Sequence, residues 1–206
     1  MVHCFSSMFS HSMHLNRRTP IYPLKVHRLE QLDDAGLNVT DFICFPPGEL
    51  NERELRRFCS KFKAVSCRTF SADEDKEFKT PVKYEISDIA DVLTFARAQN
   101  KRYFLLVNEA LPLADSIMAG NIYFNSREDF ICEFFRGPGT PRDIDTKPLQ
   151  RVDARRFGSS QAREVEQLVD AVARFRYRPV IFEFSLYPYP VGKRKEHLVF
   201  WEWRKA

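Results

Sequence analysis

The sequence has no long apolar run. No stretch approaches the roughly 20 apolar residues that a membrane-spanning helix needs. Residues 1–20 lack the continuous apolar segment of a secretory signal, and they contain no acidic residue. We therefore expect no membrane association, and we expect residues 1–20 to be a flexible N-terminus.

The cysteines lack the spacing of a metal site or of a disulfide framework. There are five of them, an odd number, and no Cys-x-x-Cys pair occurs among Cys4, Cys44, Cys59, Cys67 and Cys132. Scattered, unpaired cysteines are typical of reduced thiols in a protein of the cytoplasm. The sequence thus favours a cytoplasmic location and gives no zinc motif.

Neither sign of charge dominates. The 32 basic and 28 acidic residues leave a net charge of +4, which does not by itself indicate a nucleic-acid partner. The chain is rich in apolar residues instead, at 44%, with 19 Phe, and this composition excludes a disordered chain. A chain of 206 residues can bury a real core, as one domain or as two small lobes. No internal repeat is visible.

Helical and strand patterns alternate without a regular repeat. Apolar spacing and capping residues predict helices that start at Lys25, Asn51 and Ser87, and a fourth over residues 160–176. Short β-branched and aromatic runs predict the strands, at 37–45, 65–70, 83–86, 103–107, 119–124, 130–135, 180–184 and 198–204. The fifth and sixth of these strands should form an antiparallel pair. Separate strands and helices in this mixture indicate an α+β fold.

The last two strands carry carboxylates inside apolar runs. Because side chains alternate between the faces of a strand, Ile181 and Glu183 should share one face of the first strand. The same rule places four residues on one face of the second strand: Leu198, Phe200, Glu202 and Arg204. Carboxylates in a dry environment need a cation, which could be Arg204, another side chain, or Mg²⁺ that arrives with a nucleotide. The alternative is a ladder of ion pairs between Arg204 and the two glutamates on a solvated face.

Several short motifs occur in an order that is similar to a known family. The chain resembles the ATP-grasp nucleotide-binding domain of phosphoenolpyruvate synthase and pyruvate phosphate dikinase, in a shortened form and in collinear order over residues 24–204. The segments that carry the resemblance are 24–42, 66–75, 105–111, 119–122, 137–139, 179–184 and 198–204. The glycines and the proline that the family has in the first of these segments are missing here.

The resemblance implies a two-lobed ATP-grasp-like fold, with antiparallel sheets and flanking helices. The N-terminal lobe would comprise residues 21–100 and the C-terminal lobe residues 101–206, with ATP bound between them. In the family's pattern, Lys25 and Arg68 would bind the phosphates from the first lobe. Glu109, Ala110 and Leu111 would form the hinge that holds adenine through backbone groups.

The same resemblance assigns the closing strands to metal and phosphate chemistry. Glu183 and Glu202 would be ligands of Mg²⁺, which takes hard oxygen ligands in proteins. Arg204 and Arg68 would have the catalytic role of neutralising charge during phosphoryl transfer. Two simpler interpretations remain open, in which Lys25 is an ordinary exposed lysine at a helix start and Arg68 forms a salt bridge with a nearby aspartate, Asp73 or Asp75.

The resemblance implies an ATP- and Mg²⁺-dependent enzyme, either a phosphotransferase of the kinase type or a ligase. Its acceptor would be an unidentified small molecule or partner protein. One alternative is a non-catalytic nucleotide-binding or protein-interaction module. Another is a nucleic-acid-binding protein, which would use the basic residues Arg17, Arg18, Arg53, Arg56, Arg57, Lys61 and Lys63. We favour the enzyme, with no nucleic acid as partner.

Overall fold

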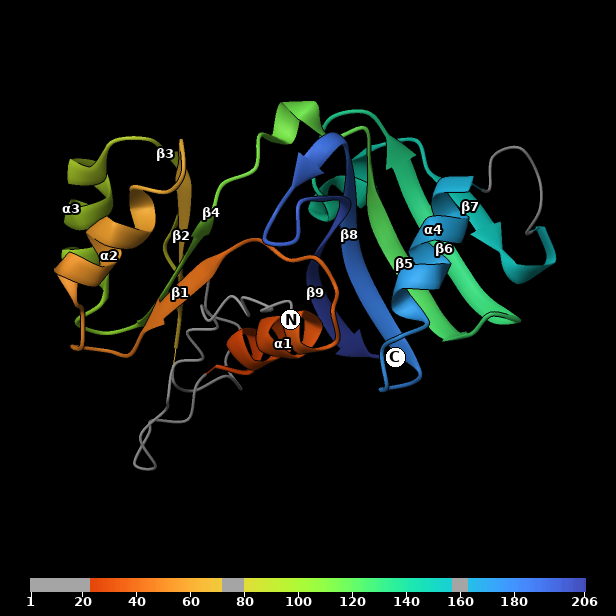
Figure 1. Ribbon diagram of the computed structural model, residues 1–206, viewed down its shortest axis with the longest axis horizontal. Helices are drawn as coiled ribbons and strands as arrows, with labels where there is room; N and C mark the ends of the chain where they lie inside the picture. The colour runs from red at the N-terminus through yellow and green to blue at the C-terminus, as the bar shows by residue number, and fades with distance from the viewer. Residues whose placement is uncertain (1–22, 72–79, 157–162) are drawn as a thin grey trace, which may run out of the picture.

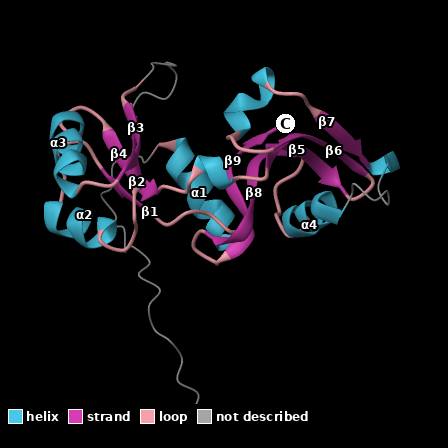
Figure 2. Ribbon diagram, turned by 90° about the horizontal axis from the view of Figure 1, so that it is seen from above, coloured by secondary structure: helices cyan, strands magenta, loops and turns pink. Residues whose placement is uncertain are grey.

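The computed structural model describes residues 23–71, 80–156 and 163–206. Two antiparallel sheets lie side by side, with helices on their outer faces and helix α1 (Leu24–Asp34) between them (Figure 1). The view from above separates the same two lobes (Figure 2). The predicted α+β architecture is confirmed, and the predicted flexible residues 1–20 lie outside the described part. No helix of the described residues is long and apolar enough to cross a membrane.

The first sheet has four strands in the order β1-β4-β2-β3. Their bounds are Phe42–Phe45 for β1, Val65–Phe70 for β2, Val82–Ile86 for β3 and Phe104–Glu109 for β4. Helices α2 (Glu52–Cys59) and α3 (Ile89–Gln99) cover one face. They bury the apolar stripes that the sequence predicts, including Leu55, Phe58, Val92, Leu93 and Ala96.

The two helices of the first lobe begin at capping side chains. Asn51 caps α2 as predicted, since its Oδ1 accepts a hydrogen bond from Glu54 N at 3.1 Å. The predicted cap at Ser87 is wrong by one residue. Asp88 caps α3, because its extended backbone lets Oδ1 accept from Ala90 N at 2.8 Å.

Strand β4 lies in the middle of the first sheet, hydrogen-bonded to both β1 and β2. The predicted division at residue 100 put this strand in the second lobe. Its apolar run is continuous because both of its faces are buried. Leu105 and Val107 pack towards α2 and α3, and Phe104 and Leu106 pack towards α1. The chain passes from one lobe to the other directly after β4.

The second sheet has five strands in the order β7-β6-β5-β8-β9. Their bounds are Met118–Ser126 for β5, Asp129–Arg136 for β6, Gln150–Asp153 for β7, Val180–Val191 for β8 and Glu196–Lys205 for β9. The predicted pairing of β5 with β6 is confirmed. Gly120 of β5 lies so close to β6 that an added Cβ would stand 2.1 Å from the Glu133 carbonyl oxygen. The described residues also form three short 3₁₀ helices: η1 (Leu113–Asp115), η2 (Pro141–Thr146) and η3 (Ala154–Arg156).

Aromatic side chains form the core between the second sheet and helix α4 (Arg163–Val172). The Phe175 ring meets the rings of Phe182 and Trp203 edge to face, each at a centroid distance of 5.1 Å. Phe182 in turn contacts Phe200 at 5.6 Å. Edge-to-face contacts of this kind stabilise a core beyond the area they bury. Phenylalanine side chains therefore make up much of the core that packs under the second sheet.

A buried asparagine fixes the segment after α1 to the β8–β9 hairpin. The Asn38 Nδ2 donates to the carbonyls of Val191 at 3.0 Å and Leu198 at 2.9 Å. Its Oδ1 accepts from Arg194 N at 2.8 Å. Because the Asn38 side chain is fully buried, each of these bonds satisfies a group that water cannot reach. Helix α1 is thereby held beside β9.

Candidate functional site

A bulge in the closing hairpin sets which side chains face the cleft between the lobes. Glu183 pairs with Glu202, but the next residue of β8, Phe184, pairs with Phe200, so Trp201 is the extra residue of β9. The extra residue shifts the side-chain alternation by one. The prediction that Leu198 and Phe200 share a face with Glu202 and Arg204 is therefore wrong, and both apolar residues pack with the core instead.

Glu183 and Glu202 lie directly opposite each other on the cleft side, and basic side chains pair with both. Arg204 NH1 lies 3.4 Å from Glu183 Oε1. On the other carboxylate, Lys25 Nζ lies 3.4 Å from Oε2 and Arg28 NH1 lies 3.5 Å from Oε1. Part of the predicted ion-pair ladder thus exists, since Arg204 pairs with Glu183. Lys25 reaches Glu202 from α1, alongside the strand, and Arg28 is a partner that sequence reasoning missed.

The two carboxylates of this pair repel each other, and the basic side chains that pair with them offset this repulsion in part. Burial raises the pKa of the Glu183 carboxyl above its usual range, and the charge of Glu202 raises it further. Two carboxylates on neighbouring strands repel each other when both are ionised. A cation placed between them would offset this repulsion. The described residues contain no cluster of three or more metal-ligating side chains, so a metal here would take its remaining ligands from a bound molecule or water.

Arg68 of β2 faces the cleft from the first lobe. Its guanidinium lies 5.8 Å from the centre of the Tyr84 ring on β3. Burial lowers the pKa of Arg68. The side chain nevertheless keeps its charge, as arginine does in proteins. Its Nε is buried and has no hydrogen-bond partner in the described part of the chain. The alternative partners Asp73 and Asp75 lie outside the described residues.

The predicted hinge, residues 109–111, begins at the last residue of β4 and leaves one backbone donor without a partner in the described part of the chain. Glu109 N donates to Asp41 O at 2.9 Å, and Ala110 N donates to Ala64 O at 3.0 Å. Leu111 N makes no hydrogen bond within the described ranges. The hinge therefore offers the N–H of Leu111 to a ligand, and not those of Glu109 and Ala110.

Two acceptors beside the hinge lack partners as well. The Asn108 Nδ2 donates to the Glu109 carbonyl at 2.8 Å, which leaves its Oδ1 buried and unbonded among the described residues. One carboxylate oxygen of Glu109, Oε2, is also buried and accepts no hydrogen bond from the described residues. Burial raises the pKa of Glu109, and the charge of Asp41 raises it further, although Lys195 opposes this shift. Buried acceptors without donors are costly, so this end of the cleft suits a molecule that carries N–H groups.

These groups line one cavity of about 300 Å³ between the two sheets. This volume is at the lower end for a small-molecule site. Six of the eight predicted site residues line it, namely Arg68, Glu109, Ala110, Leu111, Glu183 and Glu202. The other two, Lys25 and Arg204, join it through their ion pairs with the glutamates.

Sequence reasoning missed several lining residues. They include Ser66, Tyr84, Asn108, Thr140, Arg142, Asp143 and Trp201. Asn108 directly follows the buried run of β4, so its place could have been inferred from that strand. Arg142 lies in a charged loop without periodicity, and Trp201 lines the cavity beside Glu202 because the bulge lets two successive residues face the same side. No sequence signal marks these two.

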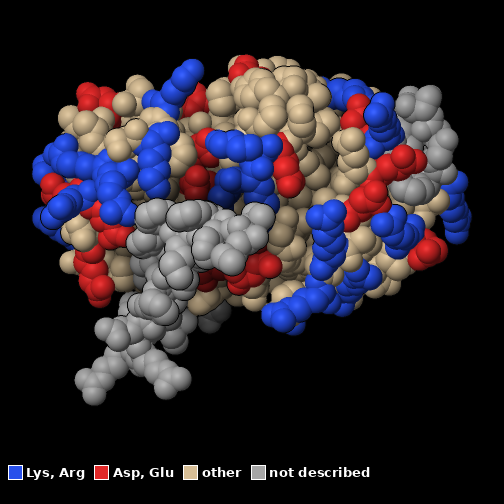
Figure 3. Space-filling view, viewed as in Figure 1, with Lys and Arg blue, Asp and Glu red and all other residues tan. Residues whose placement is uncertain are grey.

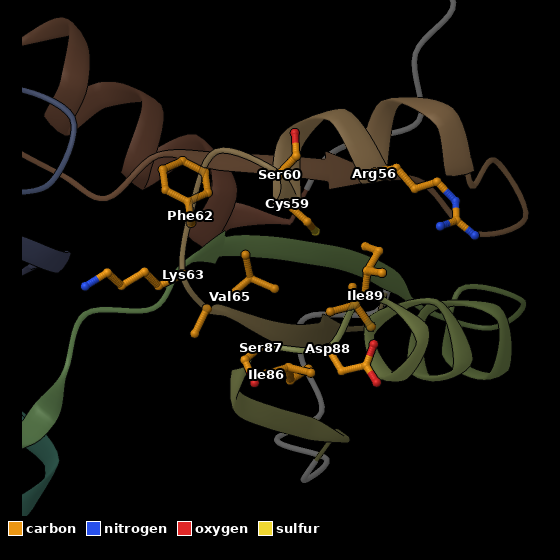
Figure 4. Close-up of a pocket in the computed structure, with 12 residues that line it drawn as sticks. Arg56, Cys59, Ser60, Phe62, Lys63, Val65, Ile86, Ser87, Asp88 and Ile89 are labelled. Atoms are coloured by element: carbon orange, nitrogen blue, oxygen red, sulfur yellow. The ribbon is translucent and has the colours of Figure 1, made fainter.

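A larger cavity, of about 480 Å³, lies within the first lobe. Figure 4 shows Phe62, Val65 and Ile89 around it, with Asp88 at the start of α3. The Asp88 carboxylate is already used to cap that helix. The cavity lacks the opposed carboxylates and the buried arginine of the cleft, so volume alone does not make it the functional site.

The basic residues of the nucleic-acid alternative lie on the solvent side of α2 and just after it, where acidic residues are interspersed (Figure 3). The described members of this set are Arg53, Arg56, Arg57, Lys61 and Lys63, all of them exposed. Leu55 and Phe58 of the same helix are buried. This arrangement is the ordinary solvated face of an amphipathic helix.

The comparisons with known proteins support the fold. No protein-family model and no curated protein matches the sequence. Among solved structures, the D-alanine-D-alanine ligase from Coxiella burnetii matches with a TM-score of 0.52 and 12% identity, over 87% of this chain and 46% of that one. An N5-carboxyaminoimidazole synthase from Aspergillus clavatus, in complex with ADP, matches with a TM-score of 0.51 and 13% identity, over 88% and 44%.

A third matching structure is that of an ATP-grasp ligase. The Chryseobacterium gregarium RiPP-associated ATP-grasp ligase, in complex with ADP and a leader and core peptide, matches with a TM-score of 0.51 and 12% identity, over 86% of this chain and 50% of that one. The chain thus spans about half the length of these structures. Its fold is an α+β ATP-grasp-like fold, as predicted. The narrower resemblance to phosphoenolpyruvate synthase and pyruvate phosphate dikinase stays a prediction.

Proposed function

We propose that the protein is an ATP-dependent ligase that binds ATP and Mg²⁺ in the cleft between its two sheets. The main support is that a pair of carboxylates and a buried arginine face each other across this cleft. Glu183 and Glu202 lie on one side, and Arg68, with its buried and unpartnered Nε, faces the cleft from the other. Carboxylates on one side and a guanidinium on the other suit a phosphate chain that carries a divalent cation. Similar folds in ligases support the reaction class.

The hinge side of the cleft would bind the adenine. The Leu111 N–H is available as a donor, and Asn108 Oδ1 is available as an acceptor for an amino group. Adenine carries both a ring acceptor and an exocyclic amino group, so it can satisfy both. Arg68 would then bind the phosphates through its planar guanidinium.

Glu183 and Glu202 would hold Mg²⁺, because Mg²⁺ is commonly bound by one or two carboxylates together with phosphate oxygens and water. When bound, the ion would neutralise charge on the phosphates. Burial and the charge of Glu202 raise the pKa of Glu183, so a bound cation would stabilise the ionised form of this carboxylate pair. Lys25 and Arg28 would keep Glu202 in place from α1.

The reaction would proceed in two steps. An oxygen of an acceptor carboxylate attacks the γ-phosphorus, the bond to the bridging oxygen breaks, and ADP leaves. An amine then attacks the acyl carbon, inorganic phosphate leaves, and the amine loses a proton to solvent. Arg68 and Arg204 would neutralise charge that develops in the first step. Transfer that stops at the first step would be the phosphotransferase variant, and the identity of the acceptor is left open.

One observation favours a second candidate, a nucleotide-binding module without catalysis. Three basic side chains already neutralise the two glutamates, namely Lys25, Arg28 and Arg204. A cleft that is neutral in this way can bind ATP without a metal. Free buried cysteines, Cys44, Cys67 and Cys132, support the proposal of a cytoplasmic location for either candidate.

Calorimetry of ATP binding with and without Mg²⁺ tests the proposal. We expect Mg²⁺ to increase ATP affinity, and we expect Glu183→Gln and Glu202→Gln each to remove most of that increase. Glu133→Gln is the matched control, since Glu133 lies in the same cross-strand row of the sheet but does not line the cavity. Metal-independent binding with unchanged mutants would favour the non-catalytic module. Release of ADP that requires an added carboxylate and amine would support the ligase.

A further inference from the structure

A contact crosses the cleft between the two lobes. Arg142, the second residue of η2 in the second lobe, donates a hydrogen bond from NH1 to the Tyr84 hydroxyl at 3.1 Å. Tyr84 lies on β3 of the first lobe, and its ring is the one that the Arg68 guanidinium approaches. Both Arg142 and Tyr84 line the cavity. The tyrosine therefore stands between an arginine of each lobe.

The backbone that carries Arg142 is held firmly. Asp143 Oδ2 accepts hydrogen bonds from Thr140 N at 2.8 Å and from Thr140 Oγ1 at 3.2 Å, which fixes the start of η2. Pro141 is buried, and Gly139 N donates to Leu113 O at 3.2 Å. The exposed Arg142 side chain thus extends from a fixed position towards the first lobe.

Arg142 lacks a carboxylate partner of its own. It forms no ion pair within the described residues. Its positive charge adds to the lowering of the Arg68 pKa by burial, and it opposes the rise in the pKa of Glu183 that burial and Glu202 cause. The guanidinium is therefore close enough to influence both sides of the cleft. Two arginines near one another are stabilised when an anion lies between them.

We propose that Arg142 is a phosphate-binding residue that the second lobe supplies, so that the phosphate chain of a nucleotide is bound between Arg68 and Arg142. This inference rests on the proposed nucleotide site. Tyr84 acts as a positioning residue, because its hydroxyl orients Arg142 and its ring lies beside Arg68. The contact between Arg142 and Tyr84 also links the two lobes, so that phosphate binding and closure of the cleft depend on the same side chain.

Titrations with ATP and with adenosine, both in the presence of Mg²⁺, test the inference. Arg142→Ala should weaken ATP binding by about 10- to 100-fold, the size expected for a charge-assisted hydrogen bond, and should change adenosine binding by less than about twofold. Arg142→Lys should give an intermediate loss, because lysine keeps the charge but not the planar fork. Arg151→Ala is the control, an exposed arginine of the same lobe that does not line the cavity.

Tyr84→Phe keeps the ring and removes the hydroxyl. It should weaken ATP binding by a smaller factor than Arg142→Ala, and it should have little effect when Arg142 is already alanine. Equal losses for ATP and adenosine, or a full loss from Tyr84→Phe in the Arg142→Ala background, would overturn the inference. Unchanged ATP binding by a folded Arg142→Ala protein would overturn it while the nucleotide site stands. If the unaltered protein binds neither ligand, the nucleotide site itself is wrong, and the inference is overturned with it.

Discussion

The two sides of the cleft differ in how far the protein satisfies its own polar groups. On the first lobe, Arg68 Nε and Asn108 Oδ1 are buried without partners in the described residues. On the second lobe, Glu183 and Glu202 have basic partners at 3.4 to 3.5 Å. The first side thus offers a buried donor and a buried acceptor to a ligand, whereas the charges of the second side are already paired. A ligand should gain most of its binding energy from the first side, while a metal must compete with arginine and lysine on the second.

Removal of the aromatic support of the second side should have the largest effect. Phe182 is fully buried and packs against Phe175 and Phe200. Phe182→Ala should lower the free energy of unfolding by about 3–5 kcal/mol, because it leaves a cavity in the core. Urea unfolding followed by fluorescence measures this loss. Phe62→Ala, a partly buried ring of the first lobe, should cost clearly less, and equal losses would contradict the difference in packing.

Removal of the buried cation of the first side should have the next largest effect. Arg68→Gln should weaken ATP binding by about 2–3 kcal/mol, in the range for hydrogen bonds to charged groups. Calorimetry measures the affinity. Arg53→Gln is the control, since Arg53 is exposed on α2 and lies away from the cavity. Comparable losses in the two variants would mean that net charge alone, and not the position of Arg68, determines binding.

A change in the first lobe outside the cleft should separate stability from binding. Asn51→Ala removes the cap of α2 and should cost about 1 kcal/mol of unfolding free energy. Because Asn51 is distant from the cleft lining, ATP affinity should stay the same. Thermal unfolding and calorimetry on the same sample check both statements. A loss of affinity would show that the first lobe binds ligand only when its helices are intact.

A change on the second side should have the smallest effect, and the size of this effect depends on pH. Burial and Glu202 raise the folded-state pKa of Glu183 above the value of 4.5 that an unperturbed glutamate has. The proton is therefore held more tightly in the folded state, and this stabilisation is complete below the unfolded pKa and is lost as pH rises through the folded pKa. Glu183→Gln, which mimics the protonated form, should stabilise the protein by about 0.5 kcal/mol at pH 7, a value typical of minor substitutions.

Unfolding measured between pH 4 and pH 7 checks this expectation. The stability difference between Glu183→Gln and the unaltered protein should shrink as pH falls towards the unfolded pKa. Glu133→Gln is the control, because the Glu133 carboxylate lies in the same cross-strand row but is more exposed, and its partner Arg151 is exposed as well. A Glu183→Gln protein that is less stable at pH 7 would mean that the ion pair with Arg204 outweighs burial.

The sequence predicted local features of this protein better than non-local ones. The cap at Asn51, the hairpin of β5 and β6, and the α+β class all follow from neighbouring residues, and the structure confirms them. The sequence also singled out Glu183 and Glu202, because a carboxylate within an apolar strand is costly to bury without a cation. The place of β4 inside the first sheet depends on contacts with β1 and β2, which no local pattern reveals.

The same difference between local and non-local features applies to the candidate site. Residues in strands and directly after them could be placed, as with Arg68 and Leu111. Tyr84 and Arg142 could not, because their contact joins an edge strand to a loop 58 positions further along the chain. The roles of all these residues towards ATP and Mg²⁺ stay predictions, which the experiments above address.

The extra residue at Trp201 is a position of the closing strand that can be lost without turning the neighbouring side chains over. Deletion of Trp201 would remove the bulge and restore regular alternation, with Glu202 still on the same side as Val199 and with Phe200 and Trp203 still packed in the core. Deletion of a residue outside the bulge, such as Trp203, would instead move every residue after it to the other face of the sheet. In the evolution of this chain, a gap in the last strand should therefore be tolerated at position 201 more readily than at its neighbours.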